Sequence, residues 1–454
     1  MMPVDGLEPL FAERAIRQQL HAGCRALDRL DLPLLRSLWY EEGTLEDQSL
    51  GSSGAIADQA PLVIDQLRSF QCHAHHLSNV EIQVEGDRAV SRCELSAVRR
   101  SPAMVDSHYR AEYRDQWSRR EGRWAIERRQ VLGGTAWTRS VADAGRGERS
   151  RRGRADPVYP LFAWLDNQGE EAGRKVVRDR QRVEVLMAEW QILRQLNHYC
   201  RGLDRFDIDL WKSVWHDDAT LDYESGHLKG RALDMAAQMT VGHEVYAGHS
   251  HQIMNPTIRI KGDRAVSETC AHAVLRGYAD PSGTVTDSHY RGRYLDRWSR
   301  RDGRWAIDHR TLTEELMWNQ PADEPWSGPE SRRDRQDPSF ALFASVEGDG
   351  GHLVEQIWAE RAIGAQLHAI GRADRHQIGT MLIRVSGNQA VSETGVIIRR
   401  PGEAGANGVA IDDHVRGRHL DRWSKREGHW ALDDRHFVED FGWRQTVEPG
   451  ATLS

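Results

Sequence analysis

One phrase of the sequence occurs three times, and this repetition constrains the fold more than any other feature. Residues 106–110 read DSHYR and are followed by WSRREGRWAI at 117–126. The phrase returns as DSHYR at 287–291 with WSRRDGRWAI at 298–307, and a third version reads DHVR at 413–416 with WSKREGHWAL at 423–432. Solenoid repeats are units of roughly 20–45 residues. The complete copies here are much longer, so we interpret them as duplicated domains.

Length and composition agree with a chain of several ordinary globular domains. The 454 residues predict two to four domains, which fits three copies. A net charge of −7, from 61 basic and 68 acidic residues, gives no reason to expect nucleic acid as a partner. Arginine alternates with glutamate and aspartate along the expected strands, which we interpret as solvent-facing sides of sheets.

Cysteine usage and hydropathy indicate where the protein resides. The five cysteines form no CxxC pair and their number is odd, which is typical of a reducing compartment with buried or free thiols. The first residues carry no charged-then-apolar leader, and no stretch approaches the roughly 18 apolar residues of a membrane span. We therefore expect a soluble cytoplasmic protein without a membrane partner.

Hydrophobic periodicity predicts the same order of elements in both complete copies. In the first copy, residues 12–39 have apolar positions at helical spacing with a break near Asp31-Leu32-Pro33, 51–54 is a loop, and 55–70 is a further helix. After His76 the period changes to two, the chain turns at 85–87, and strands follow at 89–92, 108–117 and 124–131. Helices followed by an antiparallel meander predict an α+β domain.

The repeats divide the chain into three domains and two linkers. We place the first domain at 8–138, a linker at 139–182 with one helix near 158–165, the second domain at 183–319, a linker at 320–350 and the third domain at 351–447. In the third copy Asp374 lies only two residues before His376. About 45 residues of the other copies are therefore missing, including the helices that would close one side of the domain.

Aligning the complete copies brings out residues that could act together. Asp28 precedes His75 by 47 residues, and Asp204 precedes His251 by the same 47. In each copy an arginine, Arg129 or Arg310, also stands five residues after the first tryptophan of the last strand.

An aspartate at the end of the first helix and a histidine at the start of the first long strand can both point into the space between helices and sheet. The carboxylate would accept the imidazole N–H, which fixes the tautomer and raises the basicity of the other ring nitrogen. That nitrogen could take a proton from a substrate carbon, while the arginine stabilises negative charge on an oxygen or leaving group.

With these residues the repeat resembles the SnoaL-like branch of the nuclear-transport-factor-2-like superfamily. The spacing is similar to that of its scytalone dehydratase, bile-acid 7α-dehydratase and hexachlorocyclohexane dehydrochlorinase members. The resemblance covers about 260 residues in the complete copies and about 90 in the third. It implies tandem cone-shaped α+β barrels, in which helices pack on a curved antiparallel sheet, with two complete copies and a truncated third.

The resemblance also implies roles for single residues. The family's dyad falls on Asp28 and His75 and on Asp204 and His251, and its pocket arginine on Arg129 and Arg310. The dehydratases' tyrosine, five residues before the aspartate, falls on Tyr199, whereas the first copy has Gly23 there; the dehydrochlorinases' lysine has no match. The third copy keeps His376 and Arg435 without the pocket helices, so we expect no active site in it.

Plainer interpretations of the same residues stay open. Asp28 can cap a helix or pair with a nearby arginine. The histidines at 73, 75 and 76 and at 249 and 251 have no carboxylate or cysteine at metal-ligand spacing, so we expect no metal. We expect Asp31 and Asp207 to serve a helix end, and His108 and His289 to pack across strands rather than line the pocket. The tryptophans at 117, 124, 298 and 305 are expected in the core or at a sheet edge.

Two functions from different classes follow. The first is a cofactor-independent, dehydratase-like lyase that uses the Asp–His dyad for base-assisted elimination on a hydrophobic cyclic small molecule, with isomerase or hydrolase chemistry left open. The second is a non-catalytic small-molecule-binding or assembly protein of the same superfamily. The truncated third copy favours the second, because a sheet without its helices needs a partner. The three copies could pack as a pseudo-trimer, and homo-oligomers are a further option.

Overall fold

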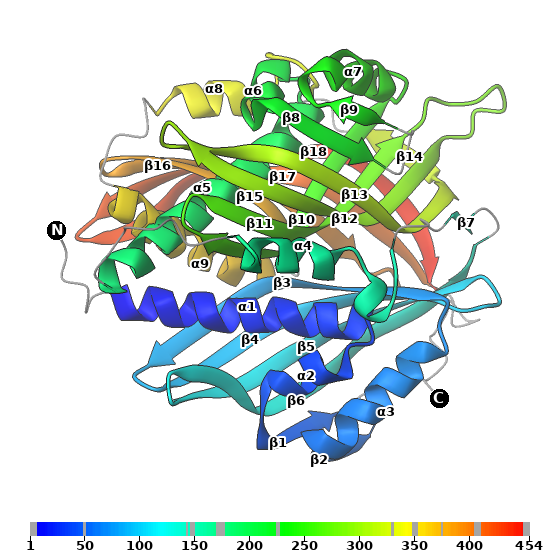
Figure 1. Ribbon diagram of the computed structural model, residues 1–454. Helices are drawn as coiled ribbons and strands as arrows, with labels where there is room; N and C mark the ends of the chain where they lie inside the picture. Colours follow the sequence, from blue (N-terminus) through cyan, green and yellow to red (C-terminus); the bar gives the residue numbers. More distant parts are fainter. Residues whose placement is uncertain are drawn as a thin grey trace.

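The computed structural model describes residues 7–48, 51–141, 144–145, 150–168, 178–223, 228–327, 331–346, 353–373, 376–403 and 410–447. Within these residues the chain forms three sheets, one for each repeat, and helices pack on them (Figure 1). The prediction of tandem α+β units with a partial third unit is confirmed.

The first repeat is a six-stranded sheet in the order β2-β1-β6-β5-β4-β3. Its helices are α1 (Glu8–Asp28), α2 (Leu32–Ser37) and α3 (Ile56–Arg68), and its strands are β1 (Trp39–Asp47), β2 (Ser52–Ala55), β3 (Cys72–Glu85), β4 (Arg88–Arg100), β5 (Val105–Arg120) and β6 (Arg123–Ser140). β3 to β6 form an antiparallel meander, and β1 runs parallel to β6. The prediction of a loop at 51–54 is wrong, because Ser52–Ala55 forms strand β2 and pairs with the end of β1.

The second repeat has the same order, β10-β11-β12-β13-β8-β9. Its helices are α5 (Arg178–Asp204), α6 (Ile208–Ser213), the short 3-10 helix η4 (Leu233–Met235) and α7 (Ala236–Glu244), and its strands are β8 (Trp215–Tyr223), β9 (Lys229–Arg231), β10 (Gly248–Lys261), β11 (Arg264–Arg276), β12 (Thr286–Arg301) and β13 (Arg304–Pro321). The short strand β7 (Ala144–Gly145) adds to β13.

The third repeat is a five-stranded sheet in the order β14-β18-β17-β16-β15. Its elements are β14 (Asp323–Ser327), α9 (Leu353–Ala373), β15 (His376–Ser386), β16 (Gln389–Arg400), β17 (Ala410–Arg426) and β18 (His429–Val447). One long helix, α9, packs on β15. Asp374 lies outside the described residues.

The helix break predicted near Asp31 is confirmed, and its cause is a capping aspartate. The Asp31 carboxylate accepts the Leu34 N–H (3.1 Å) at the start of α2, and Asp207 does the same for Leu210 (3.3 Å) at the start of α6. The residue before each cap, Leu30 or Phe206, adopts a left-handed conformation, with φ of 53° and 49°. The chain therefore leaves the long helix sharply, which places the helix end beside the first long strand.

The linkers carry short helices that cover the next sheet. α4 (Val158–Asp166) follows the 3-10 turn η2 (Gly153–Ala155), and α8 (Pro338–Ala344) occupies the second linker. The helix predicted near 158–165 is confirmed. We call the side of a sheet away from its own helices its outer face. α4 packs on the outer face of the second sheet at Val266 and Leu295, and α8 packs in the same way on the third sheet.

The repeats pack around a common centre with cyclic contacts. α1 of the first repeat contacts β10 of the second, α5 of the second contacts β15 of the third, and α9 of the third contacts β3 of the first. β3, β10 and β15 also touch one another. Figure 1 shows α1 running along the boundary between the first sheet and the rest of the molecule. The arrangement is a pseudo-threefold assembly within one chain.

Many strand arginines are buried, so the prediction of solvent-facing sheets is wrong for much of the molecule. The side chains of Arg100, Arg293, Arg310 and Arg416 are each at most 1% exposed. Arg293 lies on the outer face of the second sheet, where it binds Asp156 of the linker with two hydrogen bonds (2.9 and 2.7 Å). Outer faces that would meet water in a lone domain meet another repeat here, and acidic residues offset the cost of burial.

None of the helices in the described part of the chain is long and apolar enough to cross a membrane.

Candidate active site

The two predicted dyads form in the same way. Asp28 ends α1 and His75 lies near the start of β3; His75 Nδ1 donates to Asp28 Oδ1 at 2.6 Å, and the His75 backbone N–H donates to Oδ2 at 3.2 Å. Asp204 ends α5, and His251 Nδ1 donates to its Oδ1, also at 2.6 Å. Within the described residues, Nε2 of neither histidine has a hydrogen-bond partner. Each dyad therefore presents an imidazole with its tautomer set and its second nitrogen free.

A second histidine anchors each helix end to the same strand. His73 shares the face of β3 with His75, and its Nε2 donates to the Leu27 carbonyl at 3.0 Å. His249 Nε2 donates to the Leu203 carbonyl at 2.9 Å. Within the described residues, no group of three His, Cys, Asp or Glu side chains gathers as a metal site would require. His73 and His249 thus tie the end of the long helix to the strand that carries the dyad histidine.

The linkers close the sites from outside. Arg152 Nη2 donates to His73 Nδ1 (3.3 Å) and also bonds to the Phe70 carbonyl. Arg333 of the second linker donates to His249 Nδ1 (3.4 Å) and to the His243 carbonyl (3.1 Å). Each linker thus connects a dyad-bearing repeat to the next sheet, on which its helix is mounted.

Burial and neighbouring charges shift the pKa values of the dyad residues. Burial raises the pKa of Asp28, and the nearby Glu315 carboxylate adds to the rise. Burial and the Arg99 charge lower the pKa of His75 to about 3. Burial also opposes ionisation of Asp204, but the charge and hydrogen bond of His251 outweigh it and lower the pKa of Asp204 to about 2. The first dyad thus favours uncharged groups, whereas the second keeps an ionised carboxylate.

The predicted electrophilic residues of the second repeat lie in a packed aromatic cluster. The Tyr199 hydroxyl is hydrogen-bonded to that of Tyr223 (2.7 Å). The Arg310 guanidinium lies 4.2 Å from the ring centres of both Tyr199 and Tyr294, and its Nη1 is buried without a hydrogen-bond partner. No hydrogen bond between described residues joins Tyr199 or Arg310 to the dyad. The structure therefore brings the Asp–His pair together and keeps the Tyr–Arg pair as a separate cluster.

Arg129 and Arg310 belong to a hydrogen-bonded chain found in all three repeats. Arg310 binds Asp296 through Nε (2.6 Å) and Nη2 (2.8 Å), and Asp296 accepts from Ser267, which accepts from the Trp298 indole N–H. Equivalent chains run through Arg129, Asp115, Ser91 and Trp117 and through Arg435, Asp421, Ser392 and Trp423. The third repeat has this chain although the pocket helices are missing, so the chain supports the sheet whether or not a dyad is present. The paired tryptophans are core residues, as predicted.

Arg99 is a candidate site residue that sequence reasoning missed. It faces His73 across the β3–β4 ladder, where the second repeat has Leu275 opposite His249. Its guanidinium lies 5.7 Å from the Phe70 ring and 5.6 Å from the Tyr109 ring. Its Nε and Nη1 are buried and have no hydrogen-bond partner among the described residues. The signal was present in the strand period, because Leu95, Ala97 and Arg99 share one face of β4, and an arginine on an otherwise apolar face calls for a partner.

His289 of the second repeat and His376 and Arg435 of the third repeat are the remaining residues with a predicted role. His289 is the cross-strand neighbour of Trp318, and their rings stack with centres 4.6 Å apart, as predicted. His376 Nδ1 lies 3.3 Å from His419 Nε2, and Arg435 binds Asp421. Asp374, which lies only two residues before His376 in the sequence, is outside the described residues.

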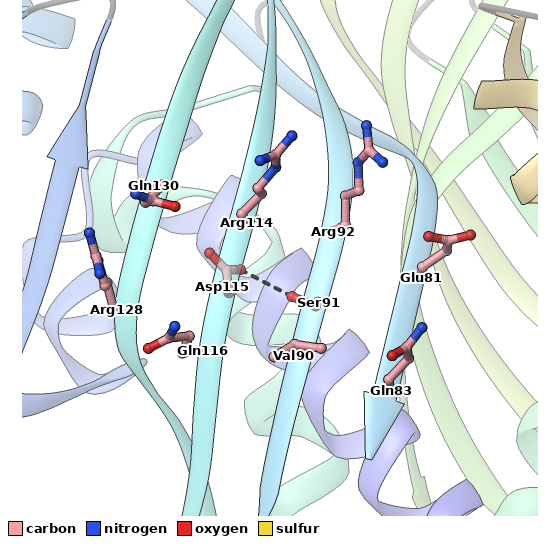
Figure 2. Close-up of a pocket in the computed structure, with 10 residues that line it drawn as sticks. All are labelled: Glu81, Gln83, Val90, Ser91, Arg92, Arg114, Asp115, Gln116, Arg128 and Gln130. Carbon is pink, nitrogen blue, oxygen red and sulfur yellow. Dashed lines mark hydrogen bonds between the residues drawn. The ribbon is translucent and has the colours of Figure 1, made fainter. Parts of the chain in front are cut away.

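One small cavity lies beside the second dyad, and a larger hollow lies on the outer face of the first sheet. A cavity of about 40 Å³ borders Asp204 and His251 on the side of the third repeat, which leaves room for about two or three waters. A larger hollow of about 340 Å³ lies over β3 to β6 of the first sheet, lined by arginine and glutamine side chains together with Glu81, Asp115, Ser91 and Val90 (Figure 2). Val90 is 50% exposed, whereas its counterparts Val266 and Val391, beneath α4 and α8, are at most 1% exposed.

The sequence matches the SnoaL-like domain family over residues 8–130 and 184–311. The chain belongs to this family, and two of its repeats carry the family's domain.

Among solved structures, an NTF2-like protein with a cystatin-like fold from Novosphingobium aromaticivorans is 25% identical, covering 28% of this chain and 86% of its own, with a TM-score of 0.27. Hexachlorocyclohexane dehydrochlorinase from Novosphingobium barchaimii is 18% identical, covering 31% and 94%, with a TM-score of 0.27. A protein from Kribbella flavida is 13% identical, covering 28% and 95%, again with a TM-score of 0.27. No curated protein matches the chain.

Proposed function

We propose that the first and second repeats are cofactor-independent acid–base sites that catalyse elimination from a hydrophobic cyclic small molecule. His75 and His251 are the bases, and Asp28 and Asp204 orient them. In the reaction Nε2 takes a proton from a ring carbon, the electrons of that C–H bond form a C=C bond, and the leaving group departs from the adjacent carbon with its bonding electrons. The observation that carries the proposal is the duplicated dyad, with 2.6 Å between Nδ1 and Oδ1 in both repeats.

The groups that stabilise the leaving group differ between the repeats. In the first repeat Arg99 supplies an unpaired guanidinium on the face of the sheet that carries the dyad. In the second repeat Tyr199 and Arg310 are the candidates, and Arg310 keeps Nη1 free although Asp296 holds the rest of its guanidinium. Buried cations act strongly on developing negative charge because little water screens them. The first repeat therefore suits a leaving group or carbonyl that becomes anionic.

Substrate entry requires the sites to open. Pockets for drug-sized ligands measure roughly 300–1,000 Å³, whereas the cavity beside Asp204 and His251 measures about 40 Å³. The contacts of Arg152 with His73 and of Arg333 with His249 join the linkers to the dyad strands. These are long, weak hydrogen bonds at the edge of each site, and we assign the opening to them.

A second candidate function is ligand binding or assembly without catalysis. The observation that favours it is the third repeat, which packs against the first two. Its sequence has no aspartate 47 residues before His376, the spacing found in the other two repeats. If this function is correct, each Asp–His pair would only fasten a strand, β3 or β10, to the end of a long helix and would not catalyse a reaction.

The experiment that separates the two functions uses glutamine in place of the dyad histidine. A Gln amide can still donate to Asp28 or Asp204, but it has no basic nitrogen. Wild type is screened against hydroxylated and halogenated ring compounds for alkene formation, and each hit is repeated with His75→Gln, His251→Gln and the control His429→Ala, which changes an exposed histidine of the third repeat. Loss of a general base lowers the rate about 10²–10⁴-fold. Because each single variant keeps the other dyad, the deciding protein is the double variant His75→Gln/His251→Gln. Turnover at the wild-type rate in that variant contradicts the proposal.

A further inference from the structure

The three repeats meet at a small cavity. The residue after the dyad-histidine position is His76 in the first repeat, Gln252 in the second and Gln377 in the third, and all three line this cavity, which measures about 30 Å³. The strands that carry them, β3, β10 and β15, contact one another. The cavity therefore lies at the pseudo-threefold centre of the molecule.

Three equivalent arginines surround the centre, each reaching into a neighbouring repeat. Arg110 donates to Gln377 Oε1 (3.1 Å), Arg291 donates to His76 Nδ1 (3.0 Å), and Arg416 donates to Ser250 Oγ (2.9 Å). All of these acceptors are uncharged. Burial lowers the pKa of Arg291 to about 10, and the charges of Arg110 and Arg416 add to the effect. The centre therefore concentrates positive charge away from water.

Two of these arginines have no carboxylate partner in the described part of the chain. Arg291 is 8% exposed and Arg416 is fully buried, yet neither forms an ion pair with a described residue. Nε of Arg291 and Nη1 of Arg416 are buried, and neither has a hydrogen-bond acceptor among the described residues. A buried guanidinium without a counter-charge is strongly unfavourable.

A second donor without a partner lines the same cavity as Arg291. The Ser78 hydroxyl is buried and has no hydrogen-bond partner in the part of the chain that the structure describes, and it follows His76 by two residues on β3. His272 and Gln252 also border the cavity and can each donate an N–H. The lining thus offers several donors beside a guanidinium that forms no ion pair with any described residue.

We propose that the pseudo-threefold centre binds one small monovalent anion, chloride under ordinary conditions, through the Nε–H of Arg291 and the hydroxyl of Ser78. A cavity of about 30 Å³ admits an atom-sized ligand and excludes phosphate or a carboxylate-bearing metabolite. Water would satisfy the hydrogen bonds but would leave the charge of Arg291 uncompensated. The anion joins the first and second repeats in a cavity that the third repeat also lines, and it holds His76, the neighbour of the dyad base His75, in place.

Bromide is the probe, because it replaces chloride and scatters anomalously. Crystals of the full chain grown in sodium bromide are predicted to show one anomalous peak in the cavity, within hydrogen-bond distance of Arg291 Nε. In parallel, Tm is measured in sodium chloride and in sodium gluconate at equal ionic strength, since gluconate is too large to enter. Wild type should gain Tm from chloride in a saturable way.

Variants separate a specific site from a general salt effect. Arg291→Met should lose the chloride-dependent gain, and in gluconate it should be at least as stable as wild type because the buried charge is gone. Ser78→Ala should need about tenfold more chloride for the same gain, a loss of about 1.4 kcal/mol in binding. The control Arg114→Met, at an exposed arginine of β5, should respond as wild type does. A cavity without a bromide peak, or an unchanged chloride response in both Arg291→Met and Ser78→Ala, overturns the proposal; if Arg291→Met fails to fold, the peak and Ser78→Ala decide.

Discussion

Asn255 of the second repeat holds the backbone of the first repeat at His75. Its Nδ2 donates to the His75 carbonyl (2.9 Å), and its Oδ1 accepts the Leu77 N–H (3.0 Å). Asn79 makes the same pair of bonds to His376 and Ile378 of the third repeat, at 2.9 and 3.3 Å. Both asparagines have positive φ, 49° and 53°, at a bulge in the strand. The dyad strand of one repeat is thus positioned by the bulge of another.

Replacing Asn255 should loosen the first dyad without touching it. Asn255→Ala leaves the His75 carbonyl and the Leu77 N–H buried without partners, at a cost of about 1–3 kcal/mol for each group. We expect a lower unfolding free energy in urea and faster hydrogen exchange at the Leu77 amide. Asn255→Asp keeps the acceptor for Leu77 and should lose less. Stability equal to wild type in the alanine variant would show that the two bonds do not hold the strand.

Replacing Arg99 should make the protein more stable. The buried Nε and Nη1 of Arg99 have no partner, and the second repeat has Leu275 at the matching place. Arg99→Leu should therefore raise the free energy of unfolding by about 1–3 kcal/mol, the penalty of unpaired buried polar groups, and abolish turnover by the first repeat. The reverse change, Leu275→Arg, should destabilise. A destabilised Arg99→Leu variant would mean that the guanidinium is stabilised in the fold and is not held ready for a substrate.

The linker aspartates should be essential for the packing of repeats. Asp337 binds Arg418 through two hydrogen bonds (2.9 and 2.8 Å), and Arg418 is 5% exposed. Arg418 also donates to Glu393 and Asp440, so Asp337→Ala removes one of its three carboxylates and should cost about 1–3 kcal/mol for the lost buried hydrogen bonds. The double variant Asp337→Ala/Arg418→Met should recover part of that loss, because Glu393 and Asp440 keep Arg201 and Arg205 as partners. Thermal unfolding of the three proteins tests this, and a double variant no better than the single one would contradict it.

Stability should fall steeply on acidification. Burial lowers the pKa of His21, His249 and His414 to about 3, below the value of about 6.5 that an unfolded histidine has. The neutral forms contribute stability that is fully present above pH 6.5 and is lost as pH falls toward 3, because only the unfolded chain takes up these protons. Each histidine should contribute up to about 1.4 kcal/mol per pH unit in that window. Urea unfolding at pH 7, 6 and 5 measures the slope, and a flat profile would contradict the burial of these rings.

Local pattern predicted much of the fold and of the site. Apolar spacing located the long helices, the capping aspartates marked their ends, and the 47-residue spacing predicted the pairs that the structure shows 2.6 Å apart. These features depend on neighbours in sequence or on duplication. The pairing of β1 with β6 was missed because parallel partners lie far apart in the chain.

The buried arginines could not be predicted from one strand at a time. An alternation of arginine and glutamate looks the same whether the polar face meets water or another repeat, and only the packing of three repeats buries Arg291 and Arg293. The role of the linkers could not be predicted from local sequence either. Residues 150–157 (SRRGRADP) and 331–338 (SRRDRQDP) are similar, but their role appears only when Asp156 and Asp337 are seen on Arg293 and Arg418 of the next sheet.

The most direct test of the dyad account is the initial rate of elimination by the double variant His75→Gln/His251→Gln on a ring compound that wild type converts. The account predicts a fall of about 10²–10⁴-fold, with a circular dichroism spectrum like that of wild type and with His429→Ala fully active. A folded double variant that eliminates at the wild-type rate would contradict the assignment of both dyads.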